Sequence, residues 1–270
     1  MSAARPRSGA SRPRPGDAKS RVTKKARAEL AARVQAIVDE LSDAVDALAF
    51  ADPVAHVYNP LDYARDASAT FIERFVRPRP EAVLIGMNPG PWGMVQTGVP
   101  FGEVAAVRDW MGIDSGVVPP ADQHPKRPIE GFACTRSEVS GRRVWGWAAE
   151  RFGTPAAFFD RFFVWNFCPL AFMEEGGKNR TPDKLPAAER EALFEVCDRA
   201  LVRMVEAIDP ERVIGIGRFA LDRARSAIGS ESGRAFGTIL HPSPASPLAN
   251  RGWAPQAEAQ LAALGIDLDR

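Results

Sequence analysis

The sequence has few of the residues on which covalent, redox or metal chemistry usually depends. Its 270 residues include only three cysteines and three histidines. The cysteines, Cys134, Cys168 and Cys197, are odd in number and far apart, a pattern that fits neither a disulfide framework nor a zinc or iron–sulfur site. We therefore expect buried, reduced thiols and no metal centre.

Long apolar segments are absent too. No run of about 18 apolar residues occurs, so the sequence predicts no transmembrane helix. The basic residues near the N-terminus are not followed by the apolar segment of a signal peptide, and we expect an intracellular protein. With 45% apolar residues the chain can bury a full core. One α/β domain of about 200 residues with extensions is favoured over two domains.

Charge is distributed unevenly along the chain. Residues 1–30 hold nine Lys or Arg and two acids, a net charge of +7. Subtraction from the totals of 35 and 34 leaves 26 basic and 32 acidic residues, or −6, for residues 31–270. Since residues 1–30 are also poor in large apolar side chains, we expect a disordered basic tail there and one folded domain over residues 31–270. The tail would hold DNA phosphates, or would serve only solubility.

Apolar segments alternate with amphipathic helical segments. A helix is expected at about residues 25–48, and four segments suit strands: residues 82–87, 162–166, 212–217 and 237–241. This alternation predicts an α/β fold, a three-layer α/β/α sandwich with a central four-stranded, mostly parallel sheet. Asn88, Asn166 and His241 then lie at the carboxyl ends of three strands, where open sheets bind ligands.

Two loops combine conformationally special and polar residues. Residues 86–104 read GMNPGPWGMVQTGVPFGEV, and residues 240–253 read LHPSPASPLANRGW. Glycine lets the backbone approach a ligand closely, and proline fixes the path of the chain before binding. Both loops are therefore candidates for the active site.

The loops resemble those of the single-strand-selective monofunctional uracil-DNA glycosylases, a family of the uracil-DNA glycosylase superfamily. The resemblance rests on GMNPGP, TGVPFGEV, HPSP with ANRGW, and WNFCPL at residues 165–170, and is extended by HPKRP at 124–128 and SEVSG at 137–141. It covers about residues 50–265. It implies a monofunctional glycosylase that removes uracil and 5-hydroxymethyluracil from single- and double-stranded DNA, uses no cofactor, and leaves an abasic site for base excision repair.

The residues at the strand ends suit that chemistry. Asn88 cannot be a strong base, but its amide can orient a water molecule, which suffices when the bond to the base breaks early. His241, assisted by backbone N–H groups of its loop, can donate to the departing base. The amide of Asn166 can pair with O4 and N3–H of uracil, and it refuses cytosine. Neither loop offers a lysine nucleophile or a carboxylate pair.

Other roles follow from the resemblance alone. It implies that Phe101 stacks on the base, and that Met87 to Gly90 line the pocket near C5, where space for water admits 5-hydroxymethyluracil. We assign no role to five tryptophans and expect three arginines to be solvated surface residues: Trp92, Trp110, Trp145, Trp147 and Trp165, and Arg142, Arg143 and Arg218.

The loop after HPSP differs from the family pattern. The family tends to carry a basic residue where this loop enters duplex DNA, and here the small Ala245 stands instead. The expected DNA contacts are Ser243, Pro244, Ala245, Leu248 and Arg251, with Leu248 or Arg251 as the alternative wedge. This departure therefore leaves open how efficiently the protein removes a base from duplex DNA.

The sequence thus predicts a monomeric enzyme whose partner is DNA and not a membrane, located in the cytoplasm with a bacterial nucleoid or in a eukaryotic nucleus. Two alternatives remain. One is a glycosylase that prefers xanthine or hypoxanthine, and the other is a non-catalytic nucleic-acid-binding module on the same fold.

Overall fold

The structure is a computed structural model that describes residues 15–270, with the side chains of residues 15–23 and Ser230 left out. Its central sheet has four strands in the order β3(Phe162–Asn166), β2(Ala82–Gly86), β6(Arg212–Ile216) and β7(Ala235–Ile239). All neighbouring strands are parallel. The four predicted strand segments are therefore confirmed, and so is the α/β class.

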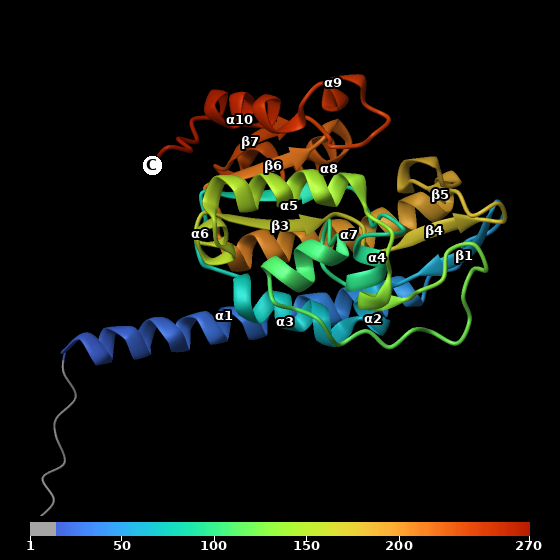
Figure 1. The fold of residues 1–270 in the computed structure, drawn as a ribbon, viewed down its shortest axis with the longest axis horizontal. Coiled ribbons are helices and arrows are strands. Elements are labelled where there is room, and N and C mark those ends of the chain that lie inside the picture. The colour runs from blue at the N-terminus through green and yellow to red at the C-terminus, as the bar shows by residue number, and fades with distance from the viewer. Residues whose placement is uncertain (1–14) are drawn as a thin grey trace, which may run out of the picture.

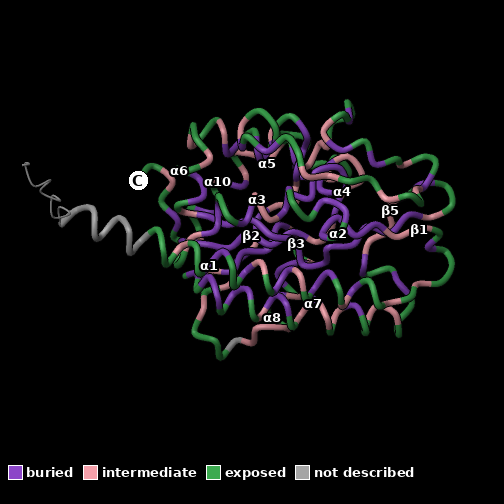
Figure 2. The backbone as a smooth tube through the Cα atoms, turned by 90° about the horizontal axis from the view of Figure 1, so that it is seen from below, coloured by how far each residue is buried: buried purple, intermediate pink, exposed green. Residues whose placement is uncertain are grey.

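Helices cover both faces of this sheet. In Figure 2, α1, α7 and α8 lie on one side of β2 and β3, and α5, α6 and α10 lie on the other. The α-helices are α1(Pro15–Asp46), α2(Pro60–Tyr63), α3(Arg65–Phe75), α4(Met94–Thr97), α5(Val139–Phe152), α6(Pro155–Phe159), α7(Ala187–Ile208), α8(Arg218–Ile228), α9(Pro247–Asn250) and α10(Trp253–Ala263). Four short helical turns complete the list: η1(Ala106–Trp110), η2(Gly131–Ala133), η3(Pro182–Lys184) and η4(Ser230–Ser232). The predicted three-layer arrangement is the one observed (Figure 1).

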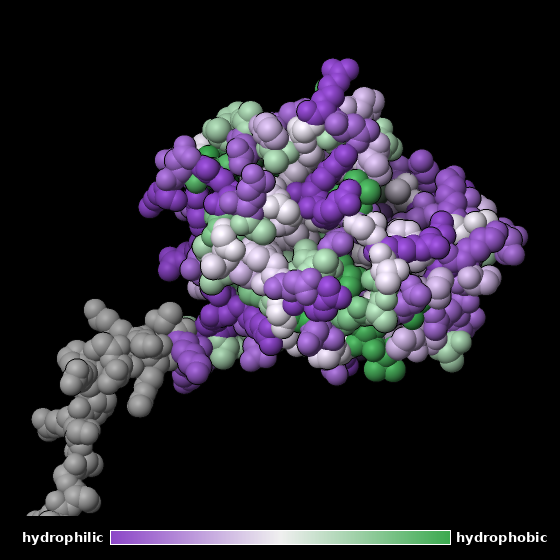
Figure 3. Space-filling view, in the orientation of Figure 1, coloured by the Kyte–Doolittle hydropathy of each residue, from purple (hydrophilic) through white to green (hydrophobic). Residues whose placement is uncertain are grey.

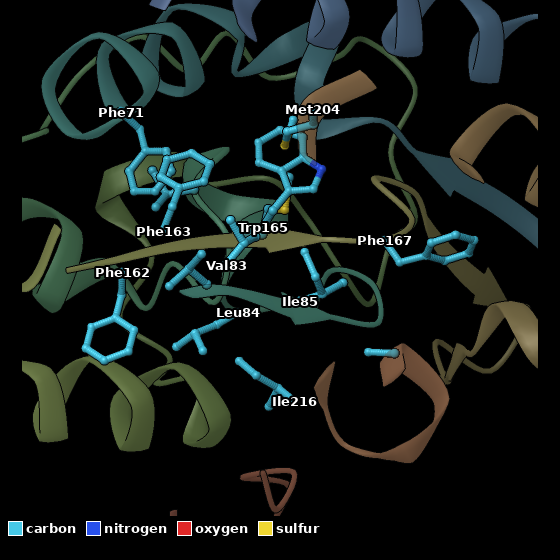
Figure 4. Close-up of a cluster of buried hydrophobic side chains, with 14 of the residues drawn as sticks. Phe71, Val83, Leu84, Ile85, Phe162, Phe163, Trp165, Phe167, Met204 and Ile216 are labelled. Atoms are coloured by element: carbon cyan, nitrogen blue, oxygen red, sulfur yellow. The ribbon is translucent and has the colours of Figure 1, made fainter. Parts of the chain in front are cut away.

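The core explains why β2 and β3 are almost wholly apolar. Both strands are buried along their full length, as central parallel strands covered on two faces must be. Successive side chains of β3 point to opposite faces. In Figure 4, Phe162 lies on the side of Leu84 and Ile216, whereas Phe163 and Trp165 lie on the other side.

A second, small sheet was not predicted. It is antiparallel, in the order β1(Val54–Tyr58), β4(Ala171–Glu174) and β5(Asn179–Arg180). β4 and β5 have four and two residues, too few to show a period in the sequence. This sheet matters for function because β5 carries Asn179 to the rim of the central sheet.

The N-terminal helix begins earlier than the sequence predicted. A disordered tail was expected over residues 1–30, but α1 starts at Pro15 and runs to Asp46. The Ala, Lys and Arg of this stretch are strong helix formers, and that propensity outweighs the low apolar content. Residues 1–14 lie outside the described part of the chain, so the prediction of disorder and DNA contact for them stays a prediction.

The surface is mostly polar. On the face shown in Figure 3, hydrophilic residues predominate and hydrophobic ones form small groups. Among the described residues, the exposed large hydrophobic side chains are Val118 and Leu248, at 73% and 53% exposure. Within residues 15–270, no helix is long and apolar enough to cross a membrane. Single exposed apolar residues are ordinary, but Leu248 lies within the second of the two loops, residues 240–253.

Candidate active site

A cavity of about 330 Å³ opens where the two loops meet. Its walls come from the ends of β2 and β3, the start of α5, the small sheet, and the loop after β7. The lining residues are Met87, Asn88, Pro89, Gly90, Pro91, Met94, Phe101, Glu138, Ser140, Asn166, Asn179, Thr181, His241, Ser243 and Pro244. The volume suits a small planar ligand. The structure thus brings together the three strand-end residues Asn88, Asn166 and His241.

Asn166 is buried in the floor of the cavity. It ends β3, pairs in register with Gly86, and is 3% exposed. Its Nδ2 lies 3.2 Å from the thioether sulfur of Met94, a weak acceptor. Its Oδ1 is buried and has no hydrogen-bond partner among the described residues. A buried acceptor without a partner costs about 1–3 kcal/mol, which indicates a place prepared for a ligand donor.

Phe101 is held beside Asn166 in a strained conformation. Its φ of 53° lies in the left-handed region that bulky residues avoid. A Cβ on Gly141 would lie 2.1 Å from the carbonyl oxygen of Phe101, so only glycine fits against it. The ring centroid is 6.4 Å from that of His241. Strain of this kind, about 1–3 kcal/mol, persists where packing enforces it and is concentrated at functional sites.

His241 is neutral and presents a donor to the cavity. Burial lowers its pKa from the ordinary value. Its Nδ1 accepts the backbone N–H of Ser243 at 3.1 Å. The proton of the neutral ring must then sit on Nε2. Among the described residues Nε2 has no hydrogen-bond partner, and it is free to donate to a bound ligand.

Asn88 is oriented by the segment that follows β3. Its Nδ2 donates to the carbonyl of Leu170 at 3.2 Å, which leaves the amide oxygen as an acceptor for water. The main chains around it are tied together as well. The N–H groups of Phe167 and Cys168 donate to the carbonyls of Gly86 and Met87, both at 2.9 Å. The backbone carrying Asn88 is therefore fixed before any ligand arrives.

The loop that carries His241 is clamped by an arginine of α5. Arg143 donates to the carbonyls of Pro242 (2.9 Å) and Ser243 (3.3 Å) and to Oδ1 of Asn250 (2.8 Å). Asn250 in turn donates to the carbonyl of Pro244 at 2.9 Å. Three consecutive carbonyls are thus satisfied by two side chains. Arg143 was expected to be a solvated surface residue; it is partly buried, and its guanidinium is engaged by this loop.

Part of the expected help from N–H groups of this loop is taken up by the loop's own hydrogen bonds. The N–H of Ser243 is used by His241, and that of Ala245 donates to Oγ of Ser243 at 3.2 Å. Pro242 and Pro244 have no N–H. The imidazole of His241 is therefore one donor that the loop offers to the cavity, whereas these N–H groups are engaged.

The residues assigned to DNA contact divide into two groups. Ser243 and Pro244 line the cavity, as do Met87 and Gly90. Ala245, Leu248 and Arg251 do not line it, and all three are exposed. Leu248 belongs to α9, which is capped at its N-terminus by the side chain of Ser246. The short helix fixes Leu248 at the surface near the cavity.

Several cavity residues were not predicted from the sequence, among them Glu138 and Asn179. Glu138 lies within SEVSG, one of the segments that extend the family resemblance. Burial raises the pKa of its carboxyl, although the backbone N–H groups of Trp92 and Ser140 donate to it. A Cβ on Gly90 would come within 2.4 Å of this carboxylate. Asn179 belongs to the two-residue strand β5, and its side chain donates to the carbonyl of Pro89 at 2.9 Å. So short a strand leaves no pattern in the sequence from which this contact could be predicted.

Charged groups near the cavity are few. Among the described residues no group of three or more His, Cys, Asp or Glu side chains could hold a metal ion. Inside the cavity the polar groups are amides, hydroxyls, one neutral imidazole and one carboxyl group. Such a set can orient water and donate to a developing anion, but it offers no strong nucleophile.

The comparison with known proteins agrees with this geometry. The family model of the uracil DNA glycosylase superfamily matches residues 73–262. The chain belongs to the uracil-DNA glycosylase superfamily. Two similar proteins carry the name single-strand selective monofunctional uracil-DNA glycosylase. That of Rattus norvegicus is 47% identical over 220 residues, which are 81% of this chain and 79% of the relative, and that of Bos taurus is 45% identical over 227 residues, 84% of each.

A solved structure supports the fold of this superfamily member. The crystal structure of the wild-type SMUG2 protein of Pedobacter heparinus has a TM-score of 0.58 and 16% sequence identity, and the match covers 85% of this chain and 97% of that one. At this identity the likeness concerns the architecture alone. The superfamily resemblance predicted from the motifs is confirmed by the family model and the relatives.

The clamp on the second loop can be tested directly. Replacing Arg143 by Ala or Lys should raise hydrogen exchange at the N–H groups of Ser243 and Ala245 by about tenfold or more, because hydrogen bonds to a charged donor contribute about 1.5–3 kcal/mol and Lys lacks the planar fork. Arg142→Ala is the matched control, since Arg142 is the exposed neighbour on α5 and is not part of the clamp. Unchanged hydrogen exchange in both Arg143 variants would show that the loop keeps its conformation without Arg143.

The protonation of His241 gives a second test. In an NMR titration its pKa should fall below about 6.5, the ordinary value, because burial disfavours the charged ring. At neutral pH the ¹⁵N shifts should show a proton on Nε2 and none on Nδ1. As the pH falls, the unfolded chain, in which His241 has its ordinary pKa, binds this proton before the folded chain does. The contribution of neutral His241 to the free energy of unfolding is therefore fully present above pH 6.5 and declines as the pH falls below that value. A pKa at or above 6.5, or a proton on Nδ1, would contradict the geometry.

Proposed function

We propose that this protein is a monofunctional uracil-DNA glycosylase that hydrolyses the N-glycosidic bond of uracil in DNA. One observation carries the proposal: Asn88, Asn166, Phe101 and His241 line a single cavity in a chain that is 47% identical to an enzyme of that name. Such an enzyme initiates base excision repair and acts wherever DNA is held, in a bacterial nucleoid or a eukaryotic nucleus. It acts as a monomer and without a cofactor.

Recognition relies on Asn166 and Phe101. The buried Oδ1 of Asn166 accepts from N3–H of uracil, and Nδ2 leaves the weak sulfur contact to donate to O4. Cytosine presents a donor at N4 and an acceptor at N3, so both contacts would become repulsive. Phe101 supplies a rigid face for the ring to stack on. The base must leave the DNA stack to reach these groups.

The chemistry needs a positioned water molecule and a donor for the leaving group. As the bond between C1′ of the sugar and N1 of uracil breaks, its electron pair leaves with the base, and the sugar acquires oxocarbenium character. Asn88 orients the water that then adds to C1′ and loses a proton to solvent. Nε2–H of neutral His241 donates to O2 of the base, where negative charge develops. No lysine lies among the residues that line the cavity, which agrees with hydrolysis without strand cleavage.

The range of substrates is the finer part of the proposal. Met87 and Gly90 line the cavity, and the carboxyl group of Glu138 lies directly behind Gly90, so this wall includes a polar group. It favours the entry of 5-hydroxymethyluracil over thymine. A panel of single-stranded and duplex oligonucleotides that carry uracil, 5-hydroxymethyluracil, xanthine or hypoxanthine tests this range. Release of a purine lesion alone would favour the first alternative, and release of no base would favour a binding module.

The two catalytic assignments have separate tests. Asn88→Ala removes the group that orients water, and His241→Ala removes the donor to the leaving base. Each should lower single-turnover uracil release by about 10²-fold or more, as the loss of one positioned polar group does. The folded state is checked by circular dichroism. A folded variant with near-normal turnover would exclude its residue from the mechanism.

Strand preference tests the role of the exposed loop. Extruding a base from a duplex costs a few kcal/mol, and a side chain that fills the gap offsets part of it. With the small Ala245 in the loop, uracil in single strands should be removed faster than uracil in U:A pairs, with U:G mismatches between them. Ala245→Arg should raise the duplex rate and leave the single-strand rate about level.

Leu248 is the alternative wedge in the same experiment. Leu248→Ala should then lower the duplex rate selectively, whereas Val118→Ala, at the other exposed large hydrophobic residue, is the matched control. Equal rates on U:A duplex and single strands for the wild type would refute the preference. If neither Ala245→Arg nor Leu248→Ala changes the duplex rate, the wedge is elsewhere, and Arg251 is the next residue to replace.

A further inference from the structure

An aromatic ring covered by two cations lies beside the cavity. Trp92 directly follows Pro91, which lines the cavity, and its side chain is only partly buried. The guanidinium carbon of Arg136 lies 4.3 Å from the centroid of the Trp92 ring, and that of Arg127 lies 5.2 Å from it. These distances are those of cation–π contacts. We call the three residues the Trp92 plate.

The cations of this plate are not neutralised by acids. Within the described part of the chain, neither Arg127 nor Arg136 forms a salt bridge. Arg127 donates to the carbonyl of Lys126 at 2.8 Å, and its Nε is buried without a partner. Exposed arginines elsewhere are of both kinds: Arg108 and Arg218 pair with Asp109 and Asp222, whereas Arg33 and Arg142 lie in no salt bridge among the described residues. Residues 31–270 carry a net −6, and the two arginines supply local positive charge beside the cavity.

The plate is built rigidly by a buried side chain. Gln96 is fully buried, and its Nε2 donates to the carbonyls of Pro91 and Pro128, both at 3.0 Å. These carbonyls belong to the residues immediately before Trp92 and immediately after Arg127. Oε1 of Gln96 accepts the N–H groups of Glu130 and Gly131 at 2.8 and 3.1 Å. One amide therefore fixes the two segments on which Trp92 and Arg127 stand.

The plate is also joined to the catalytic cavity. The backbone N–H of Trp92 donates to the carboxylate of Glu138, which lines the cavity. Arg136 precedes Glu138 by two residues in the chain. The Trp92 plate therefore adjoins the wall of the cavity that Pro91 and Glu138 form.

We propose that the Trp92 plate is a second DNA-contact surface, which holds the strand next to the extruded nucleotide. The indole stacks on a neighbouring unpaired base, and the guanidinium groups move from the indole face to phosphates. Stacking is tolerant of sequence because every base has an aromatic face, and phosphate contacts add affinity in a salt-dependent way. The inference deepens the proposed function, since it names how the strand beside the target is bound.

A plate of this kind favours unpaired DNA. In a duplex the neighbouring base is already stacked and paired, so the indole gains nothing from it. The resulting preference concerns binding of the strand, whereas the wedge at Ala245 or Leu248 concerns the opening of a duplex. The two origins of single-strand preference can therefore be separated by measuring affinity on DNA that contains no uracil.

The experiment measures affinity of the full-length protein for uracil-free single-stranded and duplex oligonucleotides by fluorescence anisotropy at several salt concentrations. Trp92→Ala should weaken single-strand binding by about tenfold, the loss expected for one stacked base. Trp92→Phe should restore most of it. Arg136→Ala should weaken binding severalfold and reduce the slope of log K against log salt by about 0.7. Duplex affinity should change less in every case.

The matched control is Arg33→Ala, at an exposed arginine of α1 far from the plate in sequence, which should leave both affinities within twofold. Single-strand affinities of Trp92→Ala and Arg136→Ala that equal the wild-type value would overturn the inference. If Trp92→Ala does not fold, Arg136→Ala and Trp92→Phe still decide it. Because no uracil is present, the result stands apart from the proposed catalysis: a wild type that releases no base would refute the function and leave this surface to be judged on affinity.

Discussion

The parallel pairing of β2 with β3 puts Gly86 opposite Asn166, and the cavity depends on that pair. A Cβ on Gly86 would lie 2.3 Å from Oδ1 of Asn166 and 2.6 Å from the Phe101 ring, so the absence of a side chain makes room for both. A slip of one residue would turn Asn166 to the other face of the sheet. Hydrogen bonds continue this pairing past Gly86 and so set the position of Asn88. In the proposed mechanism, recognition by Asn166 and water placement by Asn88 thus depend on one strand register.

Three unfavourable features of the fold lie at the cavity, where this register ends. Phe101 has a left-handed φ, and the buried amide oxygens of Asn166 and Asn179 have no partner within residues 15–270. Each such feature costs about 1–3 kcal/mol. The apolar layers on both faces of β2 and β3 supply the stability that tolerates them. A site that is already strained and unsatisfied needs little reorganisation when a ligand brings the missing donors.

The sequence predicted the elements whose signals are local. Four apolar segments with glycine or polar residues at their ends gave the strands, and these ends gave Asn88, Asn166 and His241. The clamp from Arg143 could not be predicted, because its partners lie about 100 residues away and an arginine on a helix is ordinarily solvated. Glu138 and Asn179 form hydrogen bonds with backbone groups of the loop after β2, which is distant in the sequence. No spacing of residues along the chain predicts such contacts. The start of α1 at Pro15 differed from the prediction of a disordered tail up to residue 30. The low apolar content of this stretch indicated disorder, whereas the helix propensity of its residues favoured a helix.

Charge is divided between the inside and the rim of the site. Inside, the proposed mechanism sets the leaving base against the imidazole of His241, whose pKa is lowered by burial, so that charge would develop against an oriented neutral donor and not against a cation. At the rim, Arg127 and Arg136 carry charge without acidic partners among the described residues. The net charge of −6 over residues 31–270 opposes the approach of DNA, and the proposed Trp92 plate would add local positive charge beside the cavity to that of residues 1–30. Under the two proposals, attraction outside and neutrality inside would allow one small pocket both to engage a polyanion and to release an anionic base.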